Sequence, residues 1–395
     1  MSSNTSLCIN NVQIFCEQQK IVNGSLYIED GIIVKIFEAD ESSESLNGSS
    51  HSMQRIDGKG FNLIPGFIDT HIHGANGADV MDGTEKALDR IASSLPMEGT
   101  TSFLATTITQ APEKINAALN NISTYRNKRG QAEVLGVHLE GPFIEPSKKG
   151  AQPGQYIMKP DIQQFQKWQK RSGYQIKTVT LAPEHDEDGE LIRKLFKSGV
   201  NVSAGHTAID FKGMNKAVAH GVRQVTHLCN AMNGIHHRDI GVIGAAFQLK
   251  QLRAEIIADG IHISPEMLQL IYNNMGSERL ILITDAMRAK YLQPGTYELG
   301  GQPVTVLRNQ AILKDGTLAG SVLKMNDAAK QMRLLDEVTI HQVIEMASVN
   351  PAKQLGVYAN KGSIAVGKDA DVLLVDDDLN IKYSICRGTV AFKEE

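Results

Sequence analysis

Two histidines spaced two residues apart, His71 and His73, follow the short apolar stretch Leu63-Ile-Pro-Gly-Phe-Ile-Asp69. Alternate side chains of an extended chain share one face, so both imidazoles are expected to point the same way. Together with Asp69 they could bind a divalent metal ion, although two loop histidines bonded to the backbone would give the same pattern. The choice between these interpretations depends on the residues that end the other apolar stretches.

Three more residues suited to metal binding end apolar stretches in the same way. Glu140 comes directly before a Gly-Pro pair, and His206 and His227 follow two later stretches. A buried carboxylate without a partner is costly, so Glu140 indicates either a metal ligand or a buried ion pair. His138, inside its stretch, is interpreted as a core or supporting histidine and not as a ligand.

Taken together, His71, His73, Glu140, His206 and His227 form a mixed nitrogen and oxygen set. Such a set suits zinc, iron, cobalt or manganese and not magnesium. A divalent ion of this kind turns water into a nucleophile near neutral pH, and a free carboxylate beside it can carry the proton. Asp285, after Leu280-Ile-Leu-Ile-Thr284, is interpreted as that catalytic acid or base, with capping of the next turn as the alternative. The set predicts hydrolysis of a carbonyl substrate.

Eight apolar stretches that alternate with helix-like segments predict the elements that hold these residues. The pattern is typical of an α/β protein with a (β/α)8 TIM-type barrel, whose active site lies at the carboxyl ends of its strands. The predicted strands are Leu63–Asp69, Thr101–Thr106, Val134–Glu140, Ile176–Ala182, Val200–Gly205, Arg223–Leu228, Ala254–Asp259 and Leu280–Asp285. Predicted helices include Thr84–Glu98, with Thr84 as N-cap, Asp188–Ser198, Lys212–His220 and Pro265–Asn274.

Both ends of the chain instead have sequence patterns typical of β-strands. Asn23-Gly24 and Asp30-Gly31 are hairpin-type dipeptides, and the tail has β-like stretches over 371–375 and 381–392. We expect a composite β-sandwich domain from residues 1–61 and 355–395, beside a catalytic barrel over residues 62–354. Residues 40–52 are expected to form a flexible loop, and 286–316 an excursion with β-like pieces. Helices are expected at about 322–335 and 339–349, with Pro351 just past the second.

Composition limits the protein class. The 395 residues carry a net charge of -4 with both signs interleaved, which argues against a nucleic-acid partner. The four cysteines form no CxxC pair, the amino-terminal residues lack the features of a signal peptide, and no apolar run approaches a membrane span. A cytoplasmic protein that is not bound to a membrane is expected.

At this point the motifs resemble those of the amidohydrolase superfamily over nearly the whole chain. Among its members, the chain is most similar to those that deacetylate N-acetylated amino-sugar phosphates. The motifs are Pro65-Gly-Phe-Ile-Asp-Thr-His-Ile-His-Gly74, His138-Leu-Glu-Gly-Pro-Phe143, Ser203-Ala-Gly-His-Thr207, Thr226-His-Leu-Cys-Asn-Ala-Met232, Ile257-Ala-Asp-Gly-Ile-His262, Thr284-Asp-Ala-Met287 and Gly316-Thr-Leu-Ala-Gly-Ser321. The implied reaction is hydrolysis of N-acetyl-D-glucosamine 6-phosphate to D-glucosamine 6-phosphate and acetate, a step of amino-sugar metabolism.

The resemblance also implies roles for single residues. Glu140, His206 and His227 match the metal ligands of the family, His71 and His73 match ligands of a second metal bridged by Glu140, and Asp285 matches the catalytic acid/base, with one or two ions per subunit. The implied substrate-binding residues are Asn230, Ala231 through its backbone N–H, Arg238, His262, Ala151, Leu318 and Ala319. Arg238 matches an arginine that reaches the neighbouring subunit's substrate phosphate, which implies a homodimer.

Two departures and three alternatives remain open from the sequence. Some relatives have a histidine near the position of Gln152, so a substrate contact by Gln152 is in doubt. Many members of the family bridge their metal ions with a modified lysine on the fourth strand, but Lys177 lies near the wrong end of that predicted strand. The alternative functions are deacetylation of N-acetylgalactosamine 6-phosphate, hydrolysis of another amide, or a non-catalytic scaffold that binds a sugar phosphate.

Overall fold

The computed structural model describes residues 6–17, 19–38 and 53–395, so the loop expected over 40–52 lies outside the described residues. Eight parallel strands form one sheet in the order β15-β14-β13-β12-β11-β10-β9-β6. The sheet closes on itself because the Asp285 backbone N–H donates to the His71 carbonyl at 2.8 Å and Ile72 bridges Ala286. The predicted TIM-type barrel is therefore confirmed.

The barrel strands are short and almost wholly buried, as in parallel sheets covered on both faces. They are β6 (Phe67–Ile72), β9 (Thr100–Thr107), β10 (Glu133–Glu140), β11 (Ile176–Leu181), β12 (Asn201–Ala204), β13 (Gln224–Val225), β14 (Arg253–Ile256) and β15 (Leu280–Leu282). The helices that follow them in turn are α1 (Glu85–Ser94), α2 (Pro112–Thr124), α3 (Ile162–Arg171), α4 (Glu190–Lys197), α5 (Phe211–His220), α6 (Gly241–Gln248), α7 (Pro265–Met275) and α8 (Met325–Arg333).

Side chains at the helix starts explain several of these boundaries. The Thr84 hydroxyl accepts the Ala87 N–H at 3.2 Å, which confirms Thr84 as the N-cap of α1. Asp161, Asp210 and Ser264 cap α3, α5 and α7 in the same way. An oxygen at this position satisfies a backbone N–H that the first helical turn leaves without a partner.

The stretch expected as one barrel strand over 63–69 is two strands, which corrects that prediction. β5 (Asn62–Pro65) pairs with β19 and β1 of a different sheet, and β6 starts the barrel at Phe67. The break falls at Pro65, which has no N–H for a sheet ladder, and at Gly66, where an added Cβ would meet the Thr101 side chain at 2.1 Å. This single apolar stretch of sequence therefore supplies strands to two different sheets.

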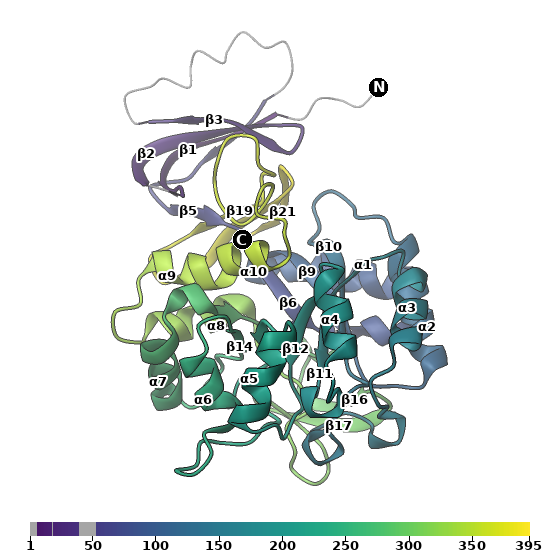
Figure 1. Ribbon diagram of the computed structural model, residues 1–395. Coiled ribbons are helices and arrows are strands. Elements are labelled where there is room, and N and C mark those ends of the chain that lie inside the picture. Colours follow the sequence, from purple (N-terminus) through teal and green to yellow (C-terminus); the bar gives the residue numbers. More distant parts are fainter. Residues whose placement is uncertain (1–5, 18, 39–52) are drawn as a thin grey trace.

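Strands from both ends of the chain form a second sheet, as expected. Its order is β21-β20-β19-β5-β1-β2-β3, and β4 pairs with β1. Figure 1 shows this sheet at the end of the barrel where β6 begins. Its strands are β1 (Ser6–Phe15), β2 (Lys20–Glu29), β3 (Ile32–Phe37), β4 (Gln54–Asp57), β5, β19 (Val372–Val375), β20 (Ile381–Cys386) and β21 (Thr389–Lys393).

Only one of the two predicted hairpin dipeptides is a turn. Asp30-Gly31 connects β2 and β3, with φ of 50° and 88°. Asn23-Gly24 lies inside β2, where Gly24 pairs with Val12 beside a register shift and Asn23 has φ of 54°. It is a β-bulge, because an extra residue with positive φ can be absorbed within a paired strand.

The excursion after β15 has the expected β-like pieces, a sheet of β16 (Gly295–Leu299), β17 (Gln302–Leu307) and β18 (Gln310–Ile312). Figure 1 shows β16 and β17 at the end of the barrel opposite the terminal sheet. A further short hairpin, β7 (Gly74–Ala75) and β8 (Ala78–Asp79), follows β6.

The placement of Pro351 just past a helix is wrong. α9 (Ile340–Ile344) runs through a π-helical turn over Glu345–Val349 into α10 (Asn350–Gln354), which contains Pro351. The proline has no N–H to donate back along the helix, and the wider turn before it makes room for its ring. None of the helices in the described ranges combines the length and apolar character needed to cross a membrane.

Lys361 forms buried ion pairs that connect the carboxyl-terminal part of the chain to the barrel. Its Nζ lies 2.6 Å from Asp371, 2.7 Å from Glu133 of β10 and 2.8 Å from Asp369, and the side chain is 5% exposed. Burial raises the pKa of Asp371, and Lys361 opposes that rise. Removal of the lysine would leave a buried carboxylate without its cation.

We therefore expect Lys361→Met to lower the free energy of unfolding by about 3–5 kcal/mol. The measurement is the urea midpoint of the variant against that of the unaltered protein. Lys128→Met is the matched control, because the Lys128 side chain is 46% exposed beside Asp89 and such surface pairs contribute at most about 1 kcal/mol. Equal midpoints for the two variants would contradict this role of Lys361.

Candidate metal centre

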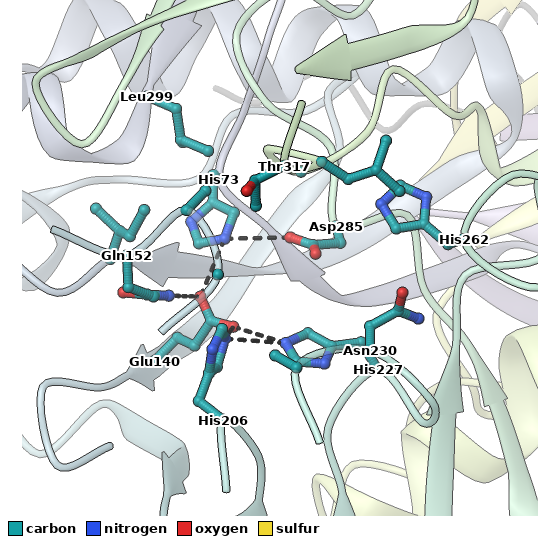
Figure 2. Close-up of a pocket in the computed structure, with 16 residues that line it drawn as sticks. His73, Glu140, Gln152, His206, His227, Asn230, His262, Asp285, Leu299 and Thr317 are labelled. Atoms are coloured by element: carbon teal, nitrogen blue, oxygen red, sulfur yellow. Dashed lines mark hydrogen bonds and ion pairs between the residues drawn. The ribbon is translucent and has the colours of Figure 1, made fainter. Parts of the chain in front are cut away.

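The carboxyl ends of four barrel strands bring the five predicted ligand residues together. His71 lies in β6 and His73 directly after it, Glu140 ends β10, and His206 and His227 each lie two residues past β12 and β13. All five side chains are buried. Asp285, three residues past β15, completes the group (Figure 2).

Glu140 lies at the centre of this group. Its Oε1 is 3.4 Å from His71 Nε2 and 3.2 Å from both His206 Nε2 and His227 Nε2, and its Oε2 is 3.3 Å from His73 Nε2. One carboxylate thus faces four imidazoles, with its two oxygens turned to different sides. Both histidine pairs, His71 with His73 and His206 with His227, therefore lie within 3.4 Å of a Glu140 oxygen.

The atoms fall into two groups, each compact enough for one ion. His71, His73 and Asp285 form one group and Glu140, His206 and His227 the other, with the ligand atoms of each within 4.8 Å of one another. Asp285 Oδ1 lies 3.2 Å from His73 Nε2 and 3.4 Å from His71 Nε2.

The hydrogen bonds of His206 indicate that a positive charge belongs in this space. Its Nδ1 lies 2.9 Å from the Lys148 carbonyl, which can only accept, so Nδ1 carries the proton. The Nε2 lone pair of a neutral ring then faces Glu140 Oε1 at 3.2 Å and His227 Nε2 at 3.1 Å. Three electron-rich atoms this close repel one another unless a cation or a proton lies between them. The donor set therefore fits a divalent ion.

The pKa values point the same way. Burial alone would lower the pKa of His73, but hydrogen bonds to Asp285 and Glu140 raise it to about 9. Burial alone would raise the pKa of Asp285, but His71 and His73 lower it to about 2. The carboxylates stay ionised and draw positive charge into the cavity.

Three of these residues have a backbone conformation that side chains rarely adopt. The φ angles are 48° at His206, 30° at His227 and 48° at Asp285. Such backbone costs of the order of 1 kcal/mol or more per residue and is concentrated at functional sites. The Asp285 backbone is held from both sides, because its N–H donates to the His71 carbonyl and its carbonyl accepts from the Ser321 N–H at 2.8 Å.

Most of the predicted substrate-binding residues line the cavity above this group. The cavity is lined by His73, Ile108, Glu140, Gly150, Ala151, Gln152, His206, His227, Asn230, Ala231, His262, Asp285, Leu299, Thr317, Leu318 and Gly320. Ala319 is buried in the same turn but does not line the cavity. Arg238 lies on the exposed loop after His227 and does not reach it. No lysine or arginine is among the described residues that form the cavity wall.

Three further residues that the sequence singled out, His138, Gln152 and Lys177, have the following contacts and positions. His138 bonds Thr180 at 2.7 Å and packs edge-on against His71, with ring centroids 4.5 Å apart, so it supports His71 and belongs to neither ligand group. Gln152 Nε2 donates to Glu140 Oε2 at 2.7 Å. Lys177 lies at the amino end of β11, away from the carboxyl ends.

The sequence reasoning missed two carboxylates that orient histidines. Asp259 Oδ2 lies 2.7 Å from His262 Nδ1, and Glu255 Oε2 lies 3.2 Å from His71 Nδ1. The signal for Glu255 was its charge within the apolar strand around Ala254 and Ile256. A search for polar residues at strand ends does not find Glu255, because Glu255 lies inside its strand.

Comparisons with known proteins agree with this geometry. Residues 62–391 match the model of the Amidohydrolase family. The chain is 45% identical over 394 residues to N-acetylglucosamine-6-phosphate deacetylase of Bacillus subtilis (strain 168), covering 98% of this chain and 97% of the relative. It is 37% identical over 330 residues to N-acetylgalactosamine-6-phosphate deacetylase of Escherichia coli O157:H7, covering 83% and 87%. The solved N-acetylglucosamine-6-phosphate deacetylase of Thermotoga maritima superposes with a TM-score of 0.85 at 33% identity, covering 98% of this chain and 100% of the other.

Proposed function

This chain belongs to the amidohydrolase family, and we propose that it is a hydrolase that deacetylates N-acetyl-D-glucosamine 6-phosphate to D-glucosamine 6-phosphate and acetate. The observation that carries the proposal is the cavity in which Glu140 contacts the imidazoles of both ligand groups and Asp285 contacts His71 and His73. Full-length similarity to enzymes of this name supports the choice of substrate.

The donor set supports a zinc, iron, cobalt or manganese ion, one or two per chain, held by Glu140, His206 and His227 and by His71 and His73. When bound, the ion polarises the acetyl carbonyl and makes water a stronger nucleophile. Asp285 is ionised and lies within 3.4 Å of His71 and His73 at the cavity wall, so it is placed to accept a proton from the attacking water. It then returns the proton to the leaving amine as the C–N bond breaks.

Substrate residues are assigned by their place in the cavity wall. Asn230, Ala231, His262, Ala151 and Leu318 face the space above the two ligand groups. We assign them to the sugar and its acetamido group, with Ala319 shaping the turn that covers the ring. The Asp259 carboxylate holds the His262 ring, which leaves its Nε2 free for the substrate.

A phosphate needs a cation that this cavity lacks. The lining of the cavity within the described ranges includes neither lysine nor arginine, and Arg238 is exposed on a nearby loop. We propose that a homodimer supplies Arg238 of one subunit to the phosphate in the other, because guanidinium matches phosphate by charge and by paired hydrogen bonds. The four cysteines are free thiols, which supports a cytoplasmic setting.

The direct test is acetate release from a panel of N-acetylated sugars. We expect turnover of N-acetyl-D-glucosamine 6-phosphate to exceed that of N-acetyl-D-galactosamine 6-phosphate and of unphosphorylated N-acetyl-D-glucosamine. Preference for the galactosamine compound would move the assignment to the activity named for the E. coli relative. Absence of acetate from every member of the panel would refute the proposed activity.

Arg238→Ala is expected to raise KM for the phosphorylated sugar about 10- to 100-fold, since a hydrogen bond to a charged group contributes about 1.5–3 kcal/mol. Turnover of unphosphorylated N-acetyl-D-glucosamine should not change, and Arg238→Lys should recover part of the loss. Arg126→Ala, another exposed arginine, is the control. Equal loss for both sugars would show that Arg238 does not bind the phosphate.

A further inference from the structure

Glu255 is a buried carboxylate that the proposed reaction does not use. It lies in β14 within the barrel and is fully buried. Its Oε2 lies 3.2 Å from His71 Nδ1, while its Oε1 accepts from Gln224 Nε2 at 2.6 Å and from the Thr70 hydroxyl at 3.4 Å. Within the described ranges its ion-pair partner is His71.

This contact fixes which ring nitrogen of His71 carries the proton and which one faces the cavity. An ionised carboxylate only accepts hydrogen bonds, so His71 Nδ1 must carry the proton. The other nitrogen, Nε2, has no hydrogen-bond partner among the residues that the structure describes, and it lies 3.4 Å from both Glu140 Oε1 and Asp285 Oδ1. Glu255 therefore holds the ring with its free lone pair aimed at the space between two carboxylates, as an acceptor behind a metal-binding histidine does.

Glu255 is itself held in place by two side-chain amides, because Gln224 bonds Glu255 and Gln354 bonds Gln224. Gln354 of α10 donates from Nε2 to Gln224 Oε1, so the Gln224 amide has its nitrogen turned to Glu255. The chain of contacts runs from α10 through β13 and β14 to β6. A glutamine at position 255 could not keep it intact, because its NH2 group would face either His71 Nδ1–H or the Gln224 NH2.

The two ligand groups differ in the acceptor that orients their histidine. His206 is oriented by a neutral carbonyl, that of Lys148, whereas His71 is oriented by a full negative charge. Glu255 thus adds a third buried carboxylate to Glu140 and Asp285 around a cavity whose described lining has no cationic side chain. The extra charge favours a second divalent ion over a single one.

We propose that Glu255 is a positioning residue: by orienting His71, it strengthens the binding of a second ion by His71 and His73, with Glu140 shared. The inference rests on the proposed function only in taking the cavity as a metal centre. Glu255 itself touches neither the ion nor the substrate, and it acts through its contact with His71.

The test is a zinc titration of metal-free protein, with ions per chain counted by mass spectrometry, on the unaltered protein, Glu255→Gln and Glu255→Asp. Glu98→Gln is the matched control, because Glu98 is also fully buried and accepts from Lys290 and Tyr291 at 2.6 Å away from the cavity. We expect two ions for the unaltered protein and for Glu98→Gln. Glu255→Gln should weaken the second ion about 10- to 100-fold and leave the first unchanged, and Glu255→Asp, which keeps the charge, should lie between.

Three outcomes would overturn the inference. They are two ions of unchanged affinity in Glu255→Gln, a single ion in the unaltered protein at every zinc concentration, and loss of folding in both Glu255 variants while Glu98→Gln folds. Acetate release by the same preparations reports the proposed function separately. Two ions without acetate would refute that function and leave the role of Glu255 standing.

Discussion

Replacement of Asp285 by asparagine is expected to lower kcat by about 10²–10⁴-fold, the usual contribution of a general acid or base. Asparagine keeps the shape of the side chain, and the backbone remains held by the His71 carbonyl and the Ser321 N–H. The amide cannot accept the proton of the attacking water or return it to the amine. Because the imidazoles and Glu140 remain, the metal content should not fall.

The measurement pairs acetate release with metal analysis of the same sample. Asp210→Asn is the matched control, since Asp210 caps α5 outside the ligand groups and asparagine caps helices equally well. A kcat within a few-fold of the unaltered protein would refute the acid/base role. Loss of the metal would instead make Asp285 a ligand.

Glu140→Gln is expected to abolish metal binding by both groups and to lower kcat by about 10³-fold or more. The expected size follows because an ion that polarises a carbonyl contributes several kcal/mol, and each 1.36 kcal/mol is about tenfold in rate. Among the described residues, Glu140 is the carboxylate that lies within 3.4 Å of all four imidazoles, so its charge supports both positions. An uncharged amide with an NH2 group cannot take its place.

Metal content and acetate release again decide the result. Glu145→Gln serves as control, because Glu145 lies five residues further on and bonds His185 and the Ser147 N–H. Retention of both ions by Glu140→Gln would contradict the shared-ligand geometry. A similar loss in Glu145→Gln would point to misfolding of the loop after β10.

The barrel could be predicted from the sequence because each strand and helix carries its own periodic signal. The alternation of apolar stretches and capped helices was enough to place α1 at Thr84 and seven of the eight strands. The errors fell where a distant segment decides the local structure. Pro65 joins a sheet formed with the tail, Asn23-Gly24 is absorbed by pairing with β1, and Pro351 follows a π-helical turn.

The site was predictable to the extent that its residues follow strand ends. That rule, which depends only on barrel topology, pointed to His71, His73, Glu140, His206 and His227 as a group. It could not find Glu255, whose contact with His71 joins residues 184 positions apart. It also could not show that Gln152 bonds Glu140, since that depends on the path of the loop after β10.

Deacetylation by this protein is proposed to depend on a divalent ion held by these side chains. The most direct measurement is acetate release from N-acetyl-D-glucosamine 6-phosphate by one preparation before chelation, after chelation and after return of zinc, iron, cobalt or manganese. We predict one acetate per sugar consumed, loss of release on chelation and recovery with at least one of the four ions. Undiminished release by the metal-free protein, or none from the protein loaded with any of these ions, would contradict the claim.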